Sequence, residues 1–181
     1  MYYVSIYFDE KTNHRIQQYI NAVAKKTGND FMIQEKVPPH ITITAFETKQ
    51  ENSVLAVLEN CFGQLKKGEV QWASVGAFLP HVIYIAPILN KYLHRMSKEI
   101  CADLESLEEV SISSYYRPLQ WLPHTTIGKK LSKEEMGISF EVLQNQFGMF
   151  QGEVRKIGLA KTNPYEDILL WELEVGQCVC L

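Results

Sequence analysis

Residues 37 to 43 read VPPHITI, and residues 122 to 127 read LPHTTI. Each stretch places a histidine directly after a proline and two residues before a threonine, in a chain that has only five histidines. The isoleucine and threonine content of both stretches is typical of β-strands. Because alternate residues of a strand point to the same face, each histidine should project together with its threonine, while the intervening residues face the core. The prolines restrict the backbone before each histidine and help fix where the strand begins.

The two motifs belong to a chain that alternates between predicted strands and helices. Aromatic and β-branched runs predict strands at residues 2–8, 31–34, 40–46, 70–78, 81–86, 122–128, 153–161 and 168–175. Apolar residues at helical spacing predict helices at residues 11–27, about 54–65, 88–107 and 133 to about 147. The stretch SISSYYRPLQW at 111–121 is irregular or a weak strand.

These elements recur at a nearly constant offset. The two histidine–threonine strands start 84 positions apart (40 and 124), VGAF and IGLA are 82 apart (75 and 157), and VSIYF and VIYIA are 78 apart (4 and 82). This period exceeds that of solenoid repeats, so it indicates an ancient duplication with two pseudo-symmetric halves, about residues 1–78 and 79–181. No linker rich in glycine, serine or proline separates them, so we expect one domain over residues 1–181. A turn at Leu79-Pro80 favours antiparallel pairing and an α+β fold.

Two matched histidine–threonine pairs suit the chemistry of a phosphodiester. If a two-fold axis relates the halves, His40, Thr42, His124 and Thr126 line one cleft. Because an imidazole titrates near pH 6.5, one ring can act as the base while the other, protonated, donates to the departing oxygen. The threonine hydroxyls can donate to non-bridging phosphate oxygens as charge develops there. This scheme needs neither a metal nor a cofactor, and the sequence does not say which histidine is the base.

HITI at 40–43 and HTTI at 124–127 resemble the paired His-hydrophobic-Thr-hydrophobic motifs of the 2H phosphoesterase superfamily, with Thr125 the one filler that is not aliphatic. That superfamily includes 2′-5′ RNA ligase-like proteins and RNA 2′,3′-cyclic phosphodiesterases. The resemblance spans nearly the whole chain. It implies a bilobal fold with two small antiparallel sheets backed by helices around a central cleft, four catalytic motif residues, and RNA ends or small nucleotides as substrates.

Further residues are candidates for substrate binding. The resemblance implies substrate contacts near His81, which otherwise is a polar group at a strand end. Arg117, Lys129 and Lys130 could receive a flanking phosphate or form a solvated surface. Four aromatic residues could stack on a base or pack in the core, with packing expected for the tryptophan: Tyr115, Tyr116, Trp121 and Tyr165. The substrate-binding prediction comprises His81, Arg117, Tyr116 and Lys129.

Composition bears on the partners and on the environment of the protein. The net charge of −3 and pI near 6.0 argue against binding of long duplex nucleic acid, which normally needs a basic face. No stretch approaches the roughly 18 apolar residues of a membrane span, and the first residues, MYYVSIYFDE, lack the basic start of a secretory signal. We therefore expect a cytoplasmic protein with no membrane partner, and we expect a monomer.

The cysteine and histidine patterns do not predict a metal site. Cys61, Cys101, Cys178 and Cys180 form no CxxC pair and no disulfide framework, so buried free thiols are expected. A zinc ion shared by the two motif histidines would lack a third ligand at recognisable spacing.

Two functions remain open at this level. The first is a metal-independent phosphoesterase that hydrolyses 2′,3′-cyclic phosphates of RNA ends or nucleotides, or that cleaves or forms related 2′-5′ diesters. The second is a nucleotide- or RNA-end-binding module with little turnover. The two differ in whether substitution of a motif histidine abolishes product formation or leaves binding unaltered.

Overall fold

The computed structural model describes residues 1–162 and 165–176 as a mixed α/β protein. Its strands are β1 (Tyr2–Phe8), β2 (His40–Glu47), β3 (Gly68–Phe78), β4 (Val82–Pro87), β5 (Ser111–Ile112), β6 (Thr125–Gly128), β7 (Phe150–Lys161) and β8 (Glu166–Glu172). Its α-helices are α1 (Glu10–Thr27), α2 (Phe31–Gln34), α3 (Glu51–Gln64), α4 (Lys91–Glu105) and α5 (Lys133–Gln146), and a 3₁₀ turn covers Ser114–Tyr116.

The named strands form one sheet with antiparallel pairing throughout, in the order β5-β2-β1-β7-β3-β4-β6, and β8 pairs with β7 beside this path. The α+β fold class is therefore confirmed. The two expected sheets are joined into one, because β7 is 12 residues long and changes neighbours along its length. Its residues 154–161 pair with β1, while its residues 150–154 pair with β3.

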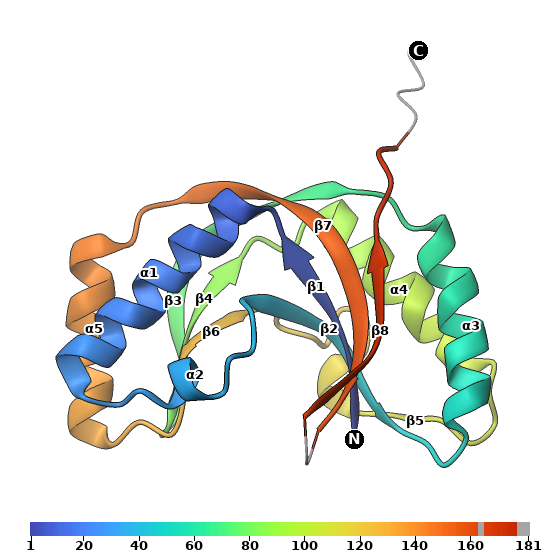
Figure 1. The fold of residues 1–181 in the computed structure, drawn as a ribbon, viewed down its shortest axis with the longest axis horizontal. Coiled ribbons are helices and arrows are strands. Elements are labelled where there is room, and N and C mark those ends of the chain that lie inside the picture. The colour runs from blue at the N-terminus through green and yellow to red at the C-terminus, as the bar shows by residue number, and fades with distance from the viewer. Residues whose placement is uncertain (163–164, 177–181) are drawn as a thin grey trace.

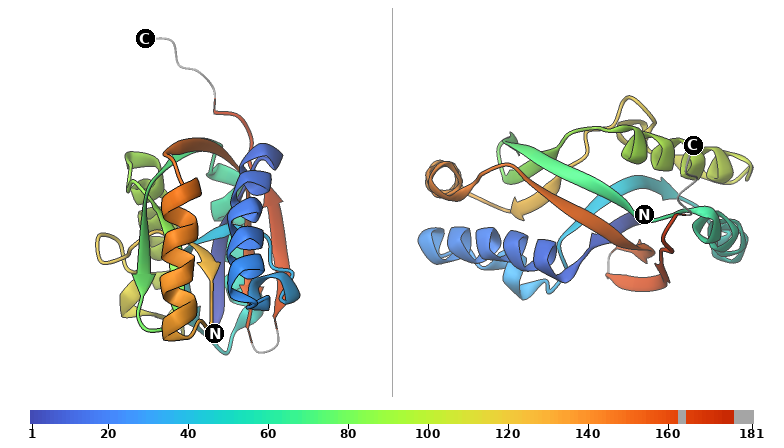
Figure 2. Two further views of the ribbon diagram at one scale, coloured as in Figure 1. Left: turned by 90° about the vertical axis from the view of Figure 1, so that its left-hand side faces the viewer. Right: turned by 90° about the horizontal axis from the view of Figure 1, so that it is seen from above.

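The longer helices lie in pairs at the two ends of the sheet (Figure 1). Helix α1 packs against α5 at one end, and α3 packs against α4 at the other. The view from above in Figure 2 shows the same arrangement, with the sheet running between the two helix pairs. Apolar residues at helical spacing make this packing possible; in α4 they are Leu93, Met96, Ile100, Cys101 and Leu104, all buried.

The order of elements repeats along the chain, as the sequence offsets predict. The series β1, α1, β2, α3, β3 corresponds to β4, α4, β6, α5, β7. The two series are interleaved in space, because β7 pairs with β1 and β3 pairs with β4. Likewise, each helix pair combines one helix of the first series with one of the second. The last strand of each series thus pairs with the first strand of the other series.

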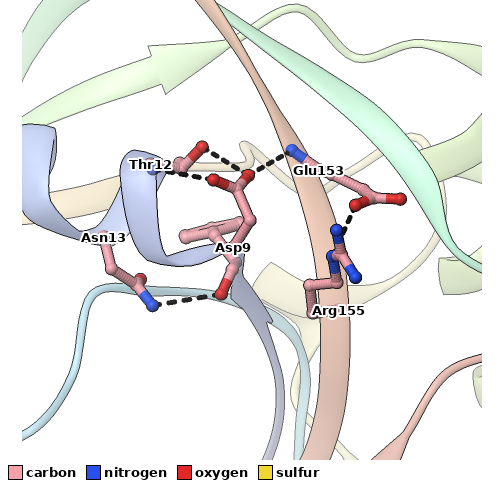
Figure 3. A network of polar contacts seen from close by, with 6 residues as sticks. Asp9, Thr12, Asn13, Glu153 and Arg155 are labelled. Atoms are coloured by element: carbon pink, nitrogen blue, oxygen red, sulfur yellow. Dashed lines mark hydrogen bonds and ion pairs between the residues drawn. The ribbon is translucent and has the colours of Figure 1, made fainter.

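The polar residue that caps the first helix of each series also bonds to a strand of the other series. Asp9 caps α1 by accepting hydrogen bonds from the Thr12 backbone N–H (3.0 Å) and hydroxyl (2.7 Å), and it also accepts from the Glu153 N–H of β7 (2.8 Å), as Figure 3 shows. Asn90 caps α4 by accepting from the Leu93 N–H, and its amide donates to the Glu69 carbonyl of β3. In both series the cap therefore ties the helix start to the other series' last strand.

Several elements differ from their predicted bounds. Residues 31–34, predicted as a strand, form α2, which starts where the Asn29 side chain accepts from the Phe31 N–H. Helix α4 begins only at Lys91 because Asn90 is its cap. Strand β6 begins at Thr125 rather than at residue 122, and Pro123 has no N–H to offer a sheet partner. Cys61 and Cys101 are buried free thiols, as predicted, while Cys178 and Cys180 lie outside the described residues.

Candidate active site

His40 and Thr42 lie at the start of β2 and alternate with the buried Ile41 and Ile43. The alternation predicted from the sequence is thus present: the isoleucines enter the core and the histidine and threonine stay half-buried. The His40 Nδ1 lies 2.9 Å from the Pro38 carbonyl oxygen. Because that oxygen can only accept, Nδ1 carries the proton, and in the neutral ring Nε2 is the acceptor.

His124 repeats this local geometry. Its Nδ1 lies 2.9 Å from the Leu122 carbonyl oxygen, which also belongs to the residue two positions earlier. His124 itself directly precedes β6, and Thr126 is half-buried between buried Thr125 and Ile127. In both motifs the proline is buried and positions a carbonyl that fixes the ring. The two neutral rings therefore have the same tautomer, with Nε2 as the acceptor nitrogen.

All four motif residues line one cavity of about 470 Å³. The remaining wall comes from β1, from the segment that includes α2, from the end of β7 and from the loop regions nearby, and it consists of Tyr3, Ser5, Tyr7, Phe31, Met32, Glu35, Val37, Tyr116, Lys129, Ala160, Thr162 and Tyr165. A space of this size is typical of a small-molecule site. The motif residues of both series thus line one concave space.

The environment lowers the pKa of both histidines. For His40, burial lowers the pKa, the Pro38 carbonyl opposes this, and the positive charges of His124 and Lys129 lower it further. For His124, burial lowers the pKa and only the Leu122 carbonyl opposes it. The charge of one ring therefore acts on the other, as expected for two imidazoles that share a site. His40 is additionally held neutral by Lys129.

The surroundings of the two rings differ despite their matched anchors. Beside Thr42, the facing residue of β1 is Ser5, whose hydroxyl lies 3.3 Å from the Thr42 hydroxyl. Beside Thr126, the facing residue of β4 is Tyr84. The Tyr84 ring lies 5.3 Å from the His124 ring, centroid to centroid. Thr42 thus faces a serine hydroxyl whereas Thr126 faces an aromatic ring, although His40 also has an aromatic neighbour, Tyr7, at 6.2 Å between ring centroids.

Two glycines at matching positions of β7 and β3 face these two neighbours of the motifs. Gly158 of β7 faces Ser5, and Gly76 of β3 faces Tyr84. A Cβ on Gly76 would lie 2.6 Å from the Tyr84 ring, so only glycine lets that ring lie across β3. Phe78, two residues further along β3, contacts the His124 ring edge-on at 4.8 Å. Gly76 therefore makes room for the aromatic support of His124.

Two tryptophans fix the motif strands from outside the motifs. The Trp72 Nε1 donates to the Thr125 hydroxyl at 3.2 Å, in a fully buried position. This bond explains why the second motif has a threonine where an aliphatic residue is usual. The Trp121 Nε1 donates to the Thr42 carbonyl at 3.0 Å, and its ring is buried, as predicted. Each tryptophan comes from the sequence half opposite to the motif that it holds.

The structure separates the other predicted contact residues into two groups. Tyr116 and Lys129 line the cavity together with the four motif residues, and Tyr165 does so too. Arg117 forms an ion pair with Glu105, and the exposed His81 directs its Nδ1 to the Leu131 carbonyl at 2.8 Å. Neither of these two lines the cavity. Lys130 lies over the Phe31 ring, 4.1 Å from its centroid.

Some residues of the cavity wall were not predicted from the sequence. Tyr3, Ser5 and Tyr7 line the cavity from one face of β1, while the alternate residues of that strand enter the core. Their polar alternation was visible in YYVSIYF and could have located them. Phe31, Met32 and Glu35 lie in or next to α2, and a segment of four residues is too short for its period to distinguish a strand from a helical turn.

Within residues 1–162 and 165–176, no three histidine, cysteine, aspartate or glutamate side chains gather as metal ligands would. In the same part of the chain, none of the helices combines the length and the apolar character that crossing a membrane requires.

The fold and the site define a class: an α+β protein in which two matched histidine–threonine strands line one cavity. A profile of the 2′-5′ RNA ligase superfamily matches residues 12–166. The chain therefore belongs to the 2′-5′ RNA ligase superfamily, which confirms the resemblance to the 2H phosphoesterases.

Solved structures share this fold at low sequence identity. One, described as a phosphoesterase, is 13% identical, with a TM-score of 0.59 over 96% of this chain and 97% of that chain. Escherichia coli LigT complexed with 3′-AMP is 14% identical, with a TM-score of 0.60 over 95% of this chain and 97% of that chain. LigT complexed with ATP is 12% identical, with a TM-score of 0.54 over 96% of each chain. No curated protein sequence matches the chain significantly.

Proposed function

We propose that the protein is a phosphoesterase that acts on a 2′,3′-cyclic phosphate at an RNA end or nucleotide, or on a related 2′-5′ diester, by two-histidine acid–base catalysis. The observation that carries the proposal is the shared cavity, in which both rings have Nδ1 anchored to a carbonyl and Nε2 as the reactive nitrogen. The scheme uses protein groups alone and requires no metal ion or cofactor.

His40 is the better candidate for the base. Burial, His124 and Lys129 all favour its neutral form, whose Nε2 can accept a proton from water or a ribose hydroxyl. His124, whose pKa is lowered by burial without a contribution from Lys129, would then donate to the departing oxygen. Thr42 and Thr126 hydroxyls would donate to the non-bridging oxygens, and Lys129 would stabilise the phosphate charge.

The ligands of the similar structures support a nucleotide as the ligand. LigT has been crystallised with 3′-AMP, with ATP and with NADP⁺. Each of these ligands joins a phosphate to a nucleoside. A cavity that combines two imidazoles, four tyrosines and a lysine offers groups for both parts.

The test is a panel of 2′,3′-cyclic nucleotides, oligoribonucleotides with cyclic ends and 2′-5′ dinucleotides, assayed with and without chelator. We expect turnover of at least one substrate class that persists in chelator. Loss of either general catalyst should reduce turnover about 10²–10⁴-fold, so His40→Ala and His124→Ala should each show it. His14→Ala, which replaces a helix histidine outside the cavity, serves as the control. Full activity of the His124→Ala protein would contradict the proposal.

A nucleotide-binding module is the second candidate, and one observation favours it. Because the pKa values of both histidines are lowered, both rings are mostly neutral near pH 7, where an acid–base pair needs one protonated ring. Under this alternative, nucleotides bind saturably, His40→Ala and His124→Ala leave the affinity unaltered, and no substrate in the panel gives product. Product formation at acidic pH separates the two candidates.

A further inference from the structure

A second cavity adjoins the proposed active site at His124. It measures about 460 Å³ and shares four wall residues with the first cavity: Tyr116, His124, Thr126 and Lys129. His40 and Thr42 do not line it. A phosphate placed between the two histidines would therefore have open space beyond His124 as well as in the first cavity.

The walls of this second cavity suit a nucleobase. Tyr115, Phe78 and Leu122 expose 80%, 41% and 48% of their surface although they are large apolar side chains. All three line the cavity, and each offers a flat or apolar face on which a base can stack. Gln120 also lines it, and its amide can both donate to and accept from the edge of a base.

The position of the second cavity beside His124 indicates which part of the substrate it would bind. The group that leaves phosphorus must receive its proton from the acid, and His124 is the histidine that both cavities share. We propose that the second cavity binds the leaving nucleoside of a ribonucleotide diester, so that the substrate has a nucleoside on each side of the reacting phosphate. This inference rests on the proposed function and narrows its substrate class.

The reaction balances without a further reactant. In a 2′-5′ dinucleotide, the 3′-hydroxyl oxygen forms a bond to phosphorus and its proton passes to the His40 Nε2. The bond between phosphorus and O5′ breaks, and O5′ takes the proton from the His124 Nε2. The products are a 2′,3′-cyclic phosphate in the first cavity and a nucleoside with a free 5′-hydroxyl in the second. A 3′-5′ diester would react in the same way through its 2′-hydroxyl.

Binding measurements test the inference independently of catalysis. The probes are AMP and a 2′-5′ diadenosine monophosphate that lacks the 3′-hydroxyl and cannot react. Stacking of one base contributes enough that its loss weakens binding about fivefold or more. We therefore expect Tyr115→Ala to lower the affinity for the dinucleotide at least about fivefold more than it lowers the affinity for AMP. Tyr115→Phe should retain most of the affinity for the dinucleotide. Phe140→Ala, which removes an aromatic residue with 40% exposure from α5, should change neither affinity.

An unchanged ratio of the two affinities in Tyr115→Ala would overturn the inference, whether neither affinity falls or both fall equally. An equal fall in both would make the second cavity the primary nucleotide site. Turnover assays keep this failure distinct from failure of the proposed function. If the wild-type protein hydrolyses cyclic nucleotides but Tyr115→Ala leaves the affinity ratio unchanged, only the second cavity has been misassigned. Absence of all turnover would instead refute the phosphoesterase proposal.

Discussion

Replacement of Thr125 by valine tests the explanation of the unusual filler in the second motif. Thr125 is 1% exposed, and its hydroxyl accepts the Trp72 Nε1–H at 3.2 Å. Valine has nearly the same shape but no acceptor, so Trp72 would keep a buried donor without a partner. Such a donor costs about 1–3 kcal/mol of unfolding free energy. For a chain of this size that corresponds to a fall in Tm of roughly 2–4 °C per kcal/mol.

Urea unfolding followed by tryptophan fluorescence measures the effect, and two controls isolate it. Thr125→Ser keeps the hydroxyl and should retain most of the stability. Thr126→Val makes the same chemical change one residue later, where the hydroxyl faces the cavity, so it should lower turnover while changing stability by less than about 0.5 kcal/mol.

A double-mutant cycle with Trp72→Phe completes the test. Trp72 also packs against Phe8 and Phe150, at ring distances of 4.9 and 4.8 Å, so its replacement is destabilising by itself. Because the double variant has no unpaired donor, it should be more stable than the sum of the single losses predicts, by about 1 kcal/mol. Additive losses, or a Thr125→Val protein as stable as the wild type, would refute the reasoning.

Three further predictions concern the two rings and their surroundings. Because both histidine pKa values lie below 6.5 and one ring must be protonated while the other is neutral, the pH profile of kcat/KM should be bell-shaped with its maximum below about pH 6.5. Lys129→Met removes a positive charge that lowers the pKa of His40, so the limb that reports His40 should move to higher pH, whereas Lys129→Arg should leave it in place. Gly76→Ala should push against the Tyr84 ring, costing about 1–3 kcal/mol in urea unfolding and lowering turnover, while Gly137→Ala in α5, where a Cβ meets nothing, should be neutral or stabilising by up to about 1 kcal/mol.

The parts of the site that local sequence controls could be predicted from the sequence. Strand periodicity places a histidine and a threonine on one face, and in β2 that alternation is present in the structure. The role of the proline is equally local, since each ring is anchored to a carbonyl two residues earlier. Tyr116 and Lys129 reach the cavity because they lie close along the chain to the second motif and its neighbouring loop.

Long-range features could not be predicted in the same way. The period of a four-residue segment cannot distinguish a strand from a single helical turn, so α2 and its contribution to the cavity were missed. Arg117 pairs with Glu105, a choice of partner that depends on how α4 and the loop after it pack. The two expected sheets are joined because β7 changes neighbours along its length, and no residue pattern within β7 predicts that change.

The crossed tryptophan bonds show why the two motifs form as a unit. Trp72, from the first sequence half, holds Thr125 of the second motif, and Trp121, from the second half, holds the Thr42 carbonyl of the first. Neither half by itself supplies both a motif and the tryptophan that donates a hydrogen bond to it. The ring tautomers, in contrast, depend only on carbonyls within each motif, so they stay alike while the surroundings diverge. The surroundings of the two motifs diverge because Ser5 faces Thr42 in the first motif, whereas Tyr84 faces Thr126 in the second.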